Sequence, residues 1–336
     1  MATLKQIAAE AGVSVMTVSN VIHNNRSKVS PATVEKVQQL IEKYHYVPNM
    51  AARSLIAKES HIIAVLLPLW HKNSSSLLLD PYAGQLTGLI ETLLRERGYY
   101  IMLCSFETVE QALTTQQNWQ MDGAVMVLPH RDDITRAVLD RATTPLVIID
   151  RWYEDKTMLS VTADDRKGGY IAARHLLEKG CRNILFPTRR PLLTNLLRGR
   201  EEGFAKAMAE FGVQNPEKNL CIVDGFHEEN GYCNAKKWLD EGREFDGICA
   251  NNDRFAIGCL RALMEAGVSI PDRVRVIGHD DMLFARYNLK RLSSVRDPID
   301  EFCNLTIESM VQMMDGKTPE QNHYVLKGSV VERETT

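Results

Sequence analysis

Apolar residues recur at helical spacing in three short segments near the amino terminus. The three stripes are Leu4, Ile7, Ala8 and Ala11, then Val18, Val21 and Ile22, then Val34, Val37, Leu40 and Ile41. Thr3 with Gln6 predicts a capping box that opens the first helix, and Gly12 predicts a left-handed residue that ends it. Ser14 predicts the cap of the second helix, and Ser30-Pro31 predicts the start of the third. The pattern therefore predicts a small three-helix module.

The first two helices of this module meet at a turn centred on Gly12. Proteins use such a helix pair to lay the second helix in the major groove of DNA. The outer face of that second helix would present Val15, Met16, Ser19, Asn20 and His23. The pattern alone equally allows a small bundle that docks onto another protein.

From His61 onward, short apolar runs alternate with amphipathic helical segments. The first set of runs covers residues 62–67, 100–103, 123–128 and 146–150, and the second covers 183–186, 220–223, 247–250 and 274–278. Fully apolar runs separated by helices indicate parallel strands that are covered on both faces. The sequence thus predicts two doubly wound α/β halves.

Positive and negative charges are distributed unevenly along the chain, which the net charge does not show. The chain of 336 residues has a formal net charge of −3, but residues 1–60 carry an excess of three positive charges and the remainder carries −6. A basic head would place the phosphate-facing surface at one end of the chain. An ordinary solvated helical surface could show the same small excess.

Cysteine usage and hydropathy indicate a cytoplasmic protein with no membrane partner. The seven cysteines are odd in number, contain no C-x-x-C pair and lie partly in strand-like apolar runs, so we expect free thiols rather than disulfides or a metal site. No apolar run approaches the roughly 18 residues that span a bilayer, and no signal peptide opens the chain.

Several motifs resemble the lactose-repressor/galactose-repressor (LacI/GalR) family of bacterial transcription regulators, and the resemblance continues along nearly the whole chain. They are Ala11-Gly12-Val13-Ser14, Thr17-Val18-Ser19, Tyr46-Val47-Pro48-Asn49 and Ala52-Arg53-Ser54-Leu55. The resemblance implies an all-α helix-turn-helix DNA-binding domain over residues 1–47 and a hinge helix with linker over residues 48–60. It implies an α/β core of the periplasmic-binding-protein type over residues 61–336. The expected N-subdomain is about 61–161 and 293–324, and the expected C-subdomain about 162–292 and 325–336.

The resemblance also implies partners for the head. A homodimer would bind a palindromic double-stranded operator through Thr3, Val15, Met16, Thr17, Ser19, Asn20, His23, Asn24, Arg53 and Leu55. Many family members carry arginine where this chain has Asn20, and asparagine suits adenine whereas arginine suits guanine. We expect Leu55 to wedge into the minor groove at the centre of the site, with a buried linker leucine as the alternative.

Polar residues at the carboxyl ends of the predicted strands match the family's effector pocket between the two subdomains. The expected effector-binding residues are Trp70, Asp150, Arg151, Arg200, Phe226, Asn252, Asp280 and Asp297. Such groups suit a polyhydroxylated ligand, so we expect a sugar or sugar derivative, or a sugar phosphate because Arg189 and Arg190 lie nearby. Alternatives remain for single residues: Asn252 or Asp253 could cap a helix, Asp281 could brace a loop, and Trp70 could cover a sheet edge.

These features favour a transcription regulator without cofactors, and we expect a repressor of carbohydrate-utilisation genes. The competing classes are a sugar-processing enzyme and a solute-binding protein built on the same α/β body. The chain has no G-x-G-x-x-G after a strand, no phosphate-binding G-x-x-x-x-G-K and no G-x-S-x-G motif, and nothing supplies a nucleophile or a metal set. A solute-binding protein would need an export signal in place of the head.

Overall fold

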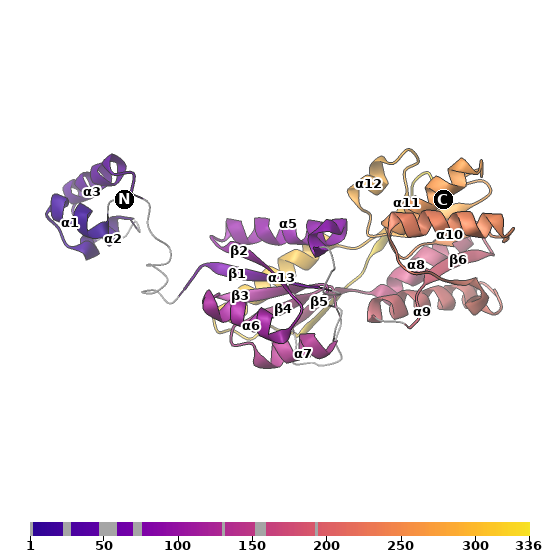
Figure 1. Cartoon of the computed structure of the whole chain (residues 1–336), viewed down its shortest axis with the longest axis horizontal. Helices are drawn as coiled ribbons and strands as arrows, with labels where there is room; N and C mark the ends of the chain where they lie inside the picture. The colour runs from indigo at the N-terminus through magenta and orange to yellow at the C-terminus, as the bar shows by residue number, and fades with distance from the viewer. Residues whose placement is uncertain are drawn as a thin grey trace. The chain divides into compact units, whose positions relative to one another are not determined.

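The computed structural model describes residues 3–22, 28–46, 59–69, 76–129, 132–151, 159–191 and 194–336. It divides the chain into two compact units, Met1–Ser60 and His61–Thr336 (Figure 1). Within the described residues, no helix combines the length and apolar character that a membrane span requires. Cys233 is exposed, and the remaining cysteines are buried free thiols.

The first unit contains the three predicted helices, α1 (Leu4–Ala11), α2 (Val15–Ile22) and α3 (Pro31–Lys43). The capping box of Thr3 and Gln6 is present, and Gly12 ends α1 in the left-handed region with a φ of 71°. The Ser14 hydroxyl accepts from the Thr17 N–H at 3.1 Å, and the Ser30 hydroxyl caps α3. The local signals for helix starts and stops are therefore confirmed.

A small apolar core holds these helices together. Ile7, Val18 and Val37, one from each helix, are fully buried. At the edge of this core, the Lys43 ammonium lies 2.6 Å from the Glu10 carboxylate and joins the end of α3 to α1. The rest of the buried cluster consists of Ala8, Ala11, Val21, Val34 and Leu40, which are the residues of the predicted stripes.

The second unit opens with a six-stranded sheet in the order β11-β5-β4-β3-β1-β2, all parallel. Its strands are β1 (Ile62–Pro68), β2 (Tyr100–Phe106), β3 (Gly123–Val127), β4 (Leu146–Ile149), β5 (Ser160–Ala163) and β11 (His323–Leu326). Helices α5 (Pro81–Glu96) and α13 (Ile299–Met314) pack on one face, and α6 (Val109–Asn118) and α7 (Asp132–Arg141) on the other. We call this the first lobe.

The second lobe is built around a sheet in the order β12-β10-β9-β8-β6-β7, in which only β12 is antiparallel to its neighbour. Its strands are β6 (Ile184–Thr188), β7 (Leu220–Ile222), β8 (Gly247–Cys249), β9 (Arg275–His279), β10 (Ser293–Arg296) and β12 (Ser329–Val331). Its helices are α8 (Asp165–Glu178) and α9 (Asn195–Glu210) on one face, α10 (Glu228–Asp240) and α11 (Asp253–Glu265) on the other, and the short α12 (Leu283–Tyr287). Two sheets with helices on both faces are the predicted fold class.

The chain passes between the lobes after β5, after β10 and after β11 in the part that the structure describes. These crossings differ from the expected subdomain boundaries. β5 and β11 keep residues 160–163 and 323–326 in the first sheet, whereas β10 pairs with β9 and β12 and keeps residues 293–296 in the second. β5 and β10 each contain one valine as their only large apolar residue, so periodicity gave no signal for their ends.

The outer strands also differ from the prediction that every strand is covered on both faces. β2 and β7 lie at sheet edges, where Tyr100 is 65% exposed and Ile222 is 60% exposed. An apolar run identifies a strand, but the strand order decides whether a neighbour covers it.

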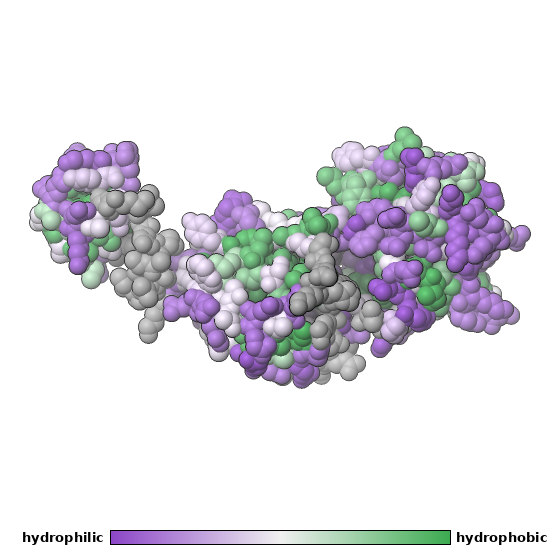
Figure 2. Space-filling model, in the orientation of Figure 1, coloured by the Kyte–Doolittle hydropathy of each residue, from purple (hydrophilic) through white to green (hydrophobic). Residues whose placement is uncertain are grey.

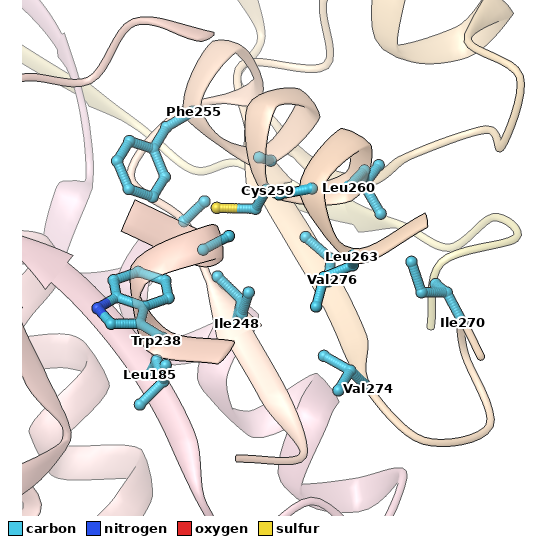
Figure 3. Packing of buried hydrophobic residues seen from close by; sticks show 14 of the residues in the cluster. Leu185, Trp238, Ile248, Phe255, Cys259, Leu260, Leu263, Ile270, Val274 and Val276 are labelled. Carbon is cyan, nitrogen blue, oxygen red and sulfur yellow. The ribbon is translucent and has the colours of Figure 1, made fainter. Parts of the chain in front are cut away.

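Close helix packing fixes the second lobe. A Cβ at Gly258 on α11 would overlap the Glu228 carbonyl on α10, and a Cβ at Gly231 on α10 would overlap the Phe255 carbonyl on α11. The two helices thus approach through a reciprocal pair of glycines. Figure 3 shows the core beneath them, in which Trp238 lies between Phe255 and the strand residue Leu185.

Candidate functional site

The outer face of α2 presents apolar side chains to solvent. Met16 is 70% exposed and Val15 is 42% exposed, although both are large and apolar. Thr17, Ser19 and Asn20 on the same helix are half-buried. Because the core of this unit is already filled by the opposite face, these side chains are available for an external partner. His23, Asn24, Arg53 and Leu55 lie outside the described residues.

The second unit contains a cavity of about 760 Å³ between its lobes. Six of the expected effector-binding residues line it, namely Asp150, Arg151, Arg200, Phe226, Asn252 and Asp280. This volume falls within the range of roughly 300–1,000 Å³ that is typical of small-molecule sites. Trp70 lies outside the described residues.

The two central carboxylates of the cavity occupy equivalent backbone positions in the two lobes. Asp150 follows β4 and Asp280 follows β9, and both adopt left-handed backbone conformations with φ values of 61° and 98°. The Asp150 N–H donates to the Val161 carbonyl of β5, and the Asp280 N–H donates to the Val295 carbonyl of β10, each at 2.8 Å. The neighbouring strands therefore hold both aspartates in a conformation that non-glycine residues rarely adopt.

Arg200 projects from α9 and is held by several acceptors. Its Nε donates to Asp165 at 3.0 Å, one terminal nitrogen donates to the Asn251 carbonyl, and the other lies 3.9 Å from Asp297. The side chain is only 6% exposed. A buried guanidinium with fixed partners presents its remaining surface to the cavity in one orientation.

Asp297 is not among the residues that line the cavity, so its expected contact with the effector stays a prediction. It is almost fully buried, and its carboxylate lies 3.3 Å from His279 Nε2 and 3.9 Å from a terminal nitrogen of Arg200. Asp297 lies in the crossing between β10 and α13 and places a carboxylate beside Arg200.

The residues at the start of α11 have mixed roles. Asn252 lines the cavity and also caps α11, because its side chain accepts from the Phe255 N–H at 2.9 Å. Asp253 is fully buried and accepts from the Ser294 hydroxyl and the Met282 N–H. Capping by Asn252 was one of the alternatives that the sequence left open.

Asp281 braces the loop after β9. Its fully buried carboxylate forms ion pairs with Arg286, Arg296 and Arg333. The bracing alternative for this residue is confirmed.

Several acidic side chains of the cavity lie close to the Arg200 guanidinium. Burial, with the neighbouring Asp165 and Asp297 carboxylates, raises the pKa of Asp150 to about 7. Burial likewise raises the pKa of Asp165 to about 6 and the pKa of Asp280 well above its ordinary value. Burial acts to lower the pKa of Arg200, but the surrounding carboxylates outweigh it and raise that pKa. The site therefore holds a permanent cation among carboxyl groups that are strong proton acceptors.

Several lining residues were not predicted. Tyr82 and Asp80 enter from the start of α5, Leu128 follows β3, and Arg254 enters from the first turn of α11. The helix start at Asp80-Pro81 was a usable signal, because an acidic cap followed by proline marks a first turn. The others carry no local signal, because their place depends on how the lobes face each other.

Comparison with known proteins connects the two units. Residues 3–49 match the family model described as bacterial regulatory proteins, lacI family, and residues 173–336 match the model described as a periplasmic binding protein-like domain. The chain is 30% identical over 343 residues to the HTH-type transcriptional regulator CelR of Thermobifida fusca, covering 99% of this chain and 98% of that protein. It is 29% identical over 338 residues to the ribose operon repressor of Escherichia coli (strain K12), covering 99% of each.

Solved structures agree over the whole length. A complex of transcriptional regulator CelR with cellobiose has a TM-score of 0.73 and 27% identity, with 100% of both chains covered. The lac repressor dimer bound to operator and the anti-inducer ONPF has a TM-score of 0.86 and 24% identity, covering 100% of this chain and 99% of that one; at this identity it shows the fold.

These matches run through the head, the linker and both lobes, and the matched relatives are regulators rather than enzymes. The enzyme and solute-binding alternatives are therefore not favoured. The chain belongs to the lacI family of bacterial regulatory proteins, and it is a DNA-binding transcription regulator that pairs a helix-turn-helix head with a two-lobed α/β core.

Proposed function

We propose that this regulator represses carbohydrate-utilisation genes by binding a palindromic operator as a homodimer in the cytoplasm, and that a sugar-like effector in the interlobe cavity switches it. The observation that carries the proposal is the cavity itself, where Asp150, Asp280 and Arg200 converge from both lobes. A ligand that binds one arrangement of the lobes better than another changes the operator affinity of the attached heads.

The proposed effector is polyhydroxylated. Carboxylates at Asp150 and Asp280 accept hydroxyl protons, Arg200 donates to ring or hydroxyl oxygens, and Phe226 offers an aromatic wall. Arg151 and Asn252 are the other expected polar residues that line the cavity. Trp70 is proposed to stack on the sugar ring. The relatives named for ribose and solved with cellobiose support this class.

A sugar phosphate is the alternative ligand, and one observation supports it. Arg189 lines the cavity, whereas Arg190 is engaged by Glu201 at 2.7 Å. A phosphate group would need such an arginine.

The proposed operator contacts centre on α2. Val15 and Met16 offer apolar contact to thymine methyl groups, and Asn20 suits adenine bidentately. Exposure of the first two supports this assignment. Thr3, Thr17, Ser19, His23 and Asn24 are proposed to contact the groove or its phosphates, and Arg53 and Leu55 the minor groove.

Exposed apolar surface supports the homodimer. In the second lobe, Leu283, Tyr287 and Leu289 are 64–85% exposed on and after α12, where Figure 2 shows hydrophobic surface. In the first lobe, Tyr100 and Leu103 are exposed on the edge strand β2. Apolar patches of this kind mark contact surfaces, and two half-sites require two copies.

The test is selection of inverted-repeat duplexes from random DNA with the purified full-length protein, followed by binding with and without each member of a sugar and sugar-phosphate panel. We expect a preferred duplex whose affinity falls steeply with salt and changes with at least one sugar. Absence of any preferred duplex under all conditions would contradict the proposal.

Replacing Asn20 by alanine tests the adenine contact. We expect affinity for the selected duplex to fall roughly five- to hundredfold, with relaxed preference at one base pair, because a bidentate contact discriminates by about 1–3 kcal/mol. Equal weakening on every sequence would assign Asn20 to the backbone instead. Lys36→Ala on the neighbouring helix α3 is a matched control for loss of a surface side chain.

A further inference from the structure

We propose that Arg254 is a positioning residue that clasps the two lobes together through Asp80 at the edge of the cavity. The proposal rests on the proposed function, since it assigns these residues to the closing of the same ligand cavity. Arg254 lies in the first turn of α11 in the second lobe, and Asp80 caps α5 in the first. One terminal nitrogen of Arg254 donates to Asp80 Oδ2 at 3.1 Å.

The arginine is oriented from within its own lobe. Its Nε and its second terminal nitrogen donate to the two oxygens of Glu228, at 2.8 and 2.7 Å. This bidentate pair fixes the plane of the guanidinium before any contact with the first lobe forms. Opening of the lobes would break the contact with Asp80 and leave the pair with Glu228 intact.

Asp80 is fixed just as firmly from the other side. Its Oδ1 accepts from the backbone N–H groups of Tyr82 and Ala83, at 3.0 and 3.3 Å, and so caps α5. Only Oδ2 is directed to Arg254. Because each carboxylate oxygen has a separate task, the residue joins a helix end in one lobe to a cation in the other.

The helix termini explain why this cation needs both carboxylates. A cation in the first turn of a helix opposes the helix dipole, whereas a carboxylate at that end is favoured. Arg254 lies at the unfavourable end of α11, while Asp80 and Glu228 lie at the favourable ends of α5 and α10. The closed arrangement thus places two carboxylates against one guanidinium and the positive ends of three helices.

The pair is shielded enough to influence closure. The side chain of Arg254 is 19% exposed and that of Asp80 is 32% exposed, in contrast to surface pairs such as Arg174 with Glu178, which are about half exposed. Salt screens exposed pairs strongly and half-buried pairs less. The clasp therefore favours the closed lobes before a ligand binds. A ligand then needs to supply less binding free energy to close them.

A measurement of lobe separation without any ligand tests the clasp independently of the effector. One spin label is attached to the exposed Cys233 on α10 and one to a cysteine introduced by Gln117→Cys on α6 of the first lobe, in full-length protein diluted with excess unlabelled protein. Pulsed electron resonance then gives the populations of short and long distances.

The variants form a double-mutant cycle. Asp80→Ser retains a helix cap but loses the bridging oxygen, and Arg254→Gln removes the cation. We expect each to raise the ratio of long to short distances roughly three- to tenfold, as befits a half-buried ion pair, and the double variant to change it no further. Arg254→Lys should restore part of the closed population, and Arg174→Gln should leave it unchanged.

Additive effects in the double variant, or distances that neither single variant changes, would overturn the clasp. Neither outcome would affect the proposed function, which is tested by the selection of duplexes and by the sugar panel. If the protein selects no duplex but the double-mutant cycle gives the expected distances, the clasp is supported and the proposed function is contradicted.

Discussion

Replacing Arg200 by leucine removes a buried cation whose partners include the carboxylates of Asp165 and Asp297. Asp165 would lose a hydrogen bond of 3.0 Å, Asp297 would lose a cation at 3.9 Å, and the Asn251 carbonyl would lose a donor. Leucine fills part of the space but cannot compensate any of these groups.

The magnitude follows from burial. Because Arg200 is 6% exposed and Asp297 is 3% exposed, water cannot replace the lost partner. Breaking a buried pair on one side costs about 3–5 kcal/mol. For a unit of this size, each kcal/mol lowers the midpoint temperature by roughly 2–4 °C, so we expect the core to melt roughly 6–20 °C lower.

Differential scanning calorimetry of the full-length protein measures the change. Arg174→Leu is the matched control, because Arg174 lies on α8, pairs with Glu178 one helical turn away and is half exposed. It should change the free energy of unfolding by roughly 0.5 kcal/mol or less. The double variant Arg200→Leu with Asp165→Leu should recover part of the loss, since an apolar pair leaves one fewer uncompensated charge.

If the free energy of unfolding of the Arg200→Leu variant falls by less than about 1 kcal/mol, the electrostatic reasoning is refuted. The same conclusion would follow if the Asp165→Leu change added to the loss instead of offsetting it. The variant should also lose sugar binding, and retained binding would assign Arg200 to structure alone.

Two further predictions concern packing and protonation. Gly258→Ala should destabilise the core by roughly 1–3 kcal/mol in urea unfolding, because its Cβ would overlap the Glu228 carbonyl, whereas Gly88→Ala on α5, where space is open, should be neutral or stabilising. The pKa of Asp150 is raised to about 7, so the folded state holds this proton more tightly than the unfolded state, and stability should fall as the pH rises from about 4 to about 7. Asp150→Asn should flatten this dependence, measured as the free energy of unfolding at each pH, and an unchanged pH profile would contradict it.

Much of the fold could be predicted because its signals are local. Helix starts at Thr3 and Ser30, the stop at Gly12 and the apolar runs of the central strands each depend on residues within one or two turns. The aspartates at 150 and 280 were also predicted, because parallel strands bring their carboxyl ends to one edge. The three passages of the chain between the lobes were expected from the family resemblance. The short strands β5 and β10 were not predicted as strands, because each contains one valine as its only large apolar residue and follows the pairing that its neighbours offer.

The residues of the site divide along the same line. Sequence by itself determined which side chains stand at strand ends and which helix face stays exposed, since both follow from backbone periodicity. Only the tertiary structure decided that Asp297 lies beside Arg200, that Asn252 caps α11 while lining the cavity, and that Arg254 pairs with Asp80. These are contacts between segments far apart in the chain, and their geometry is set by packing of whole lobes rather than by any local preference.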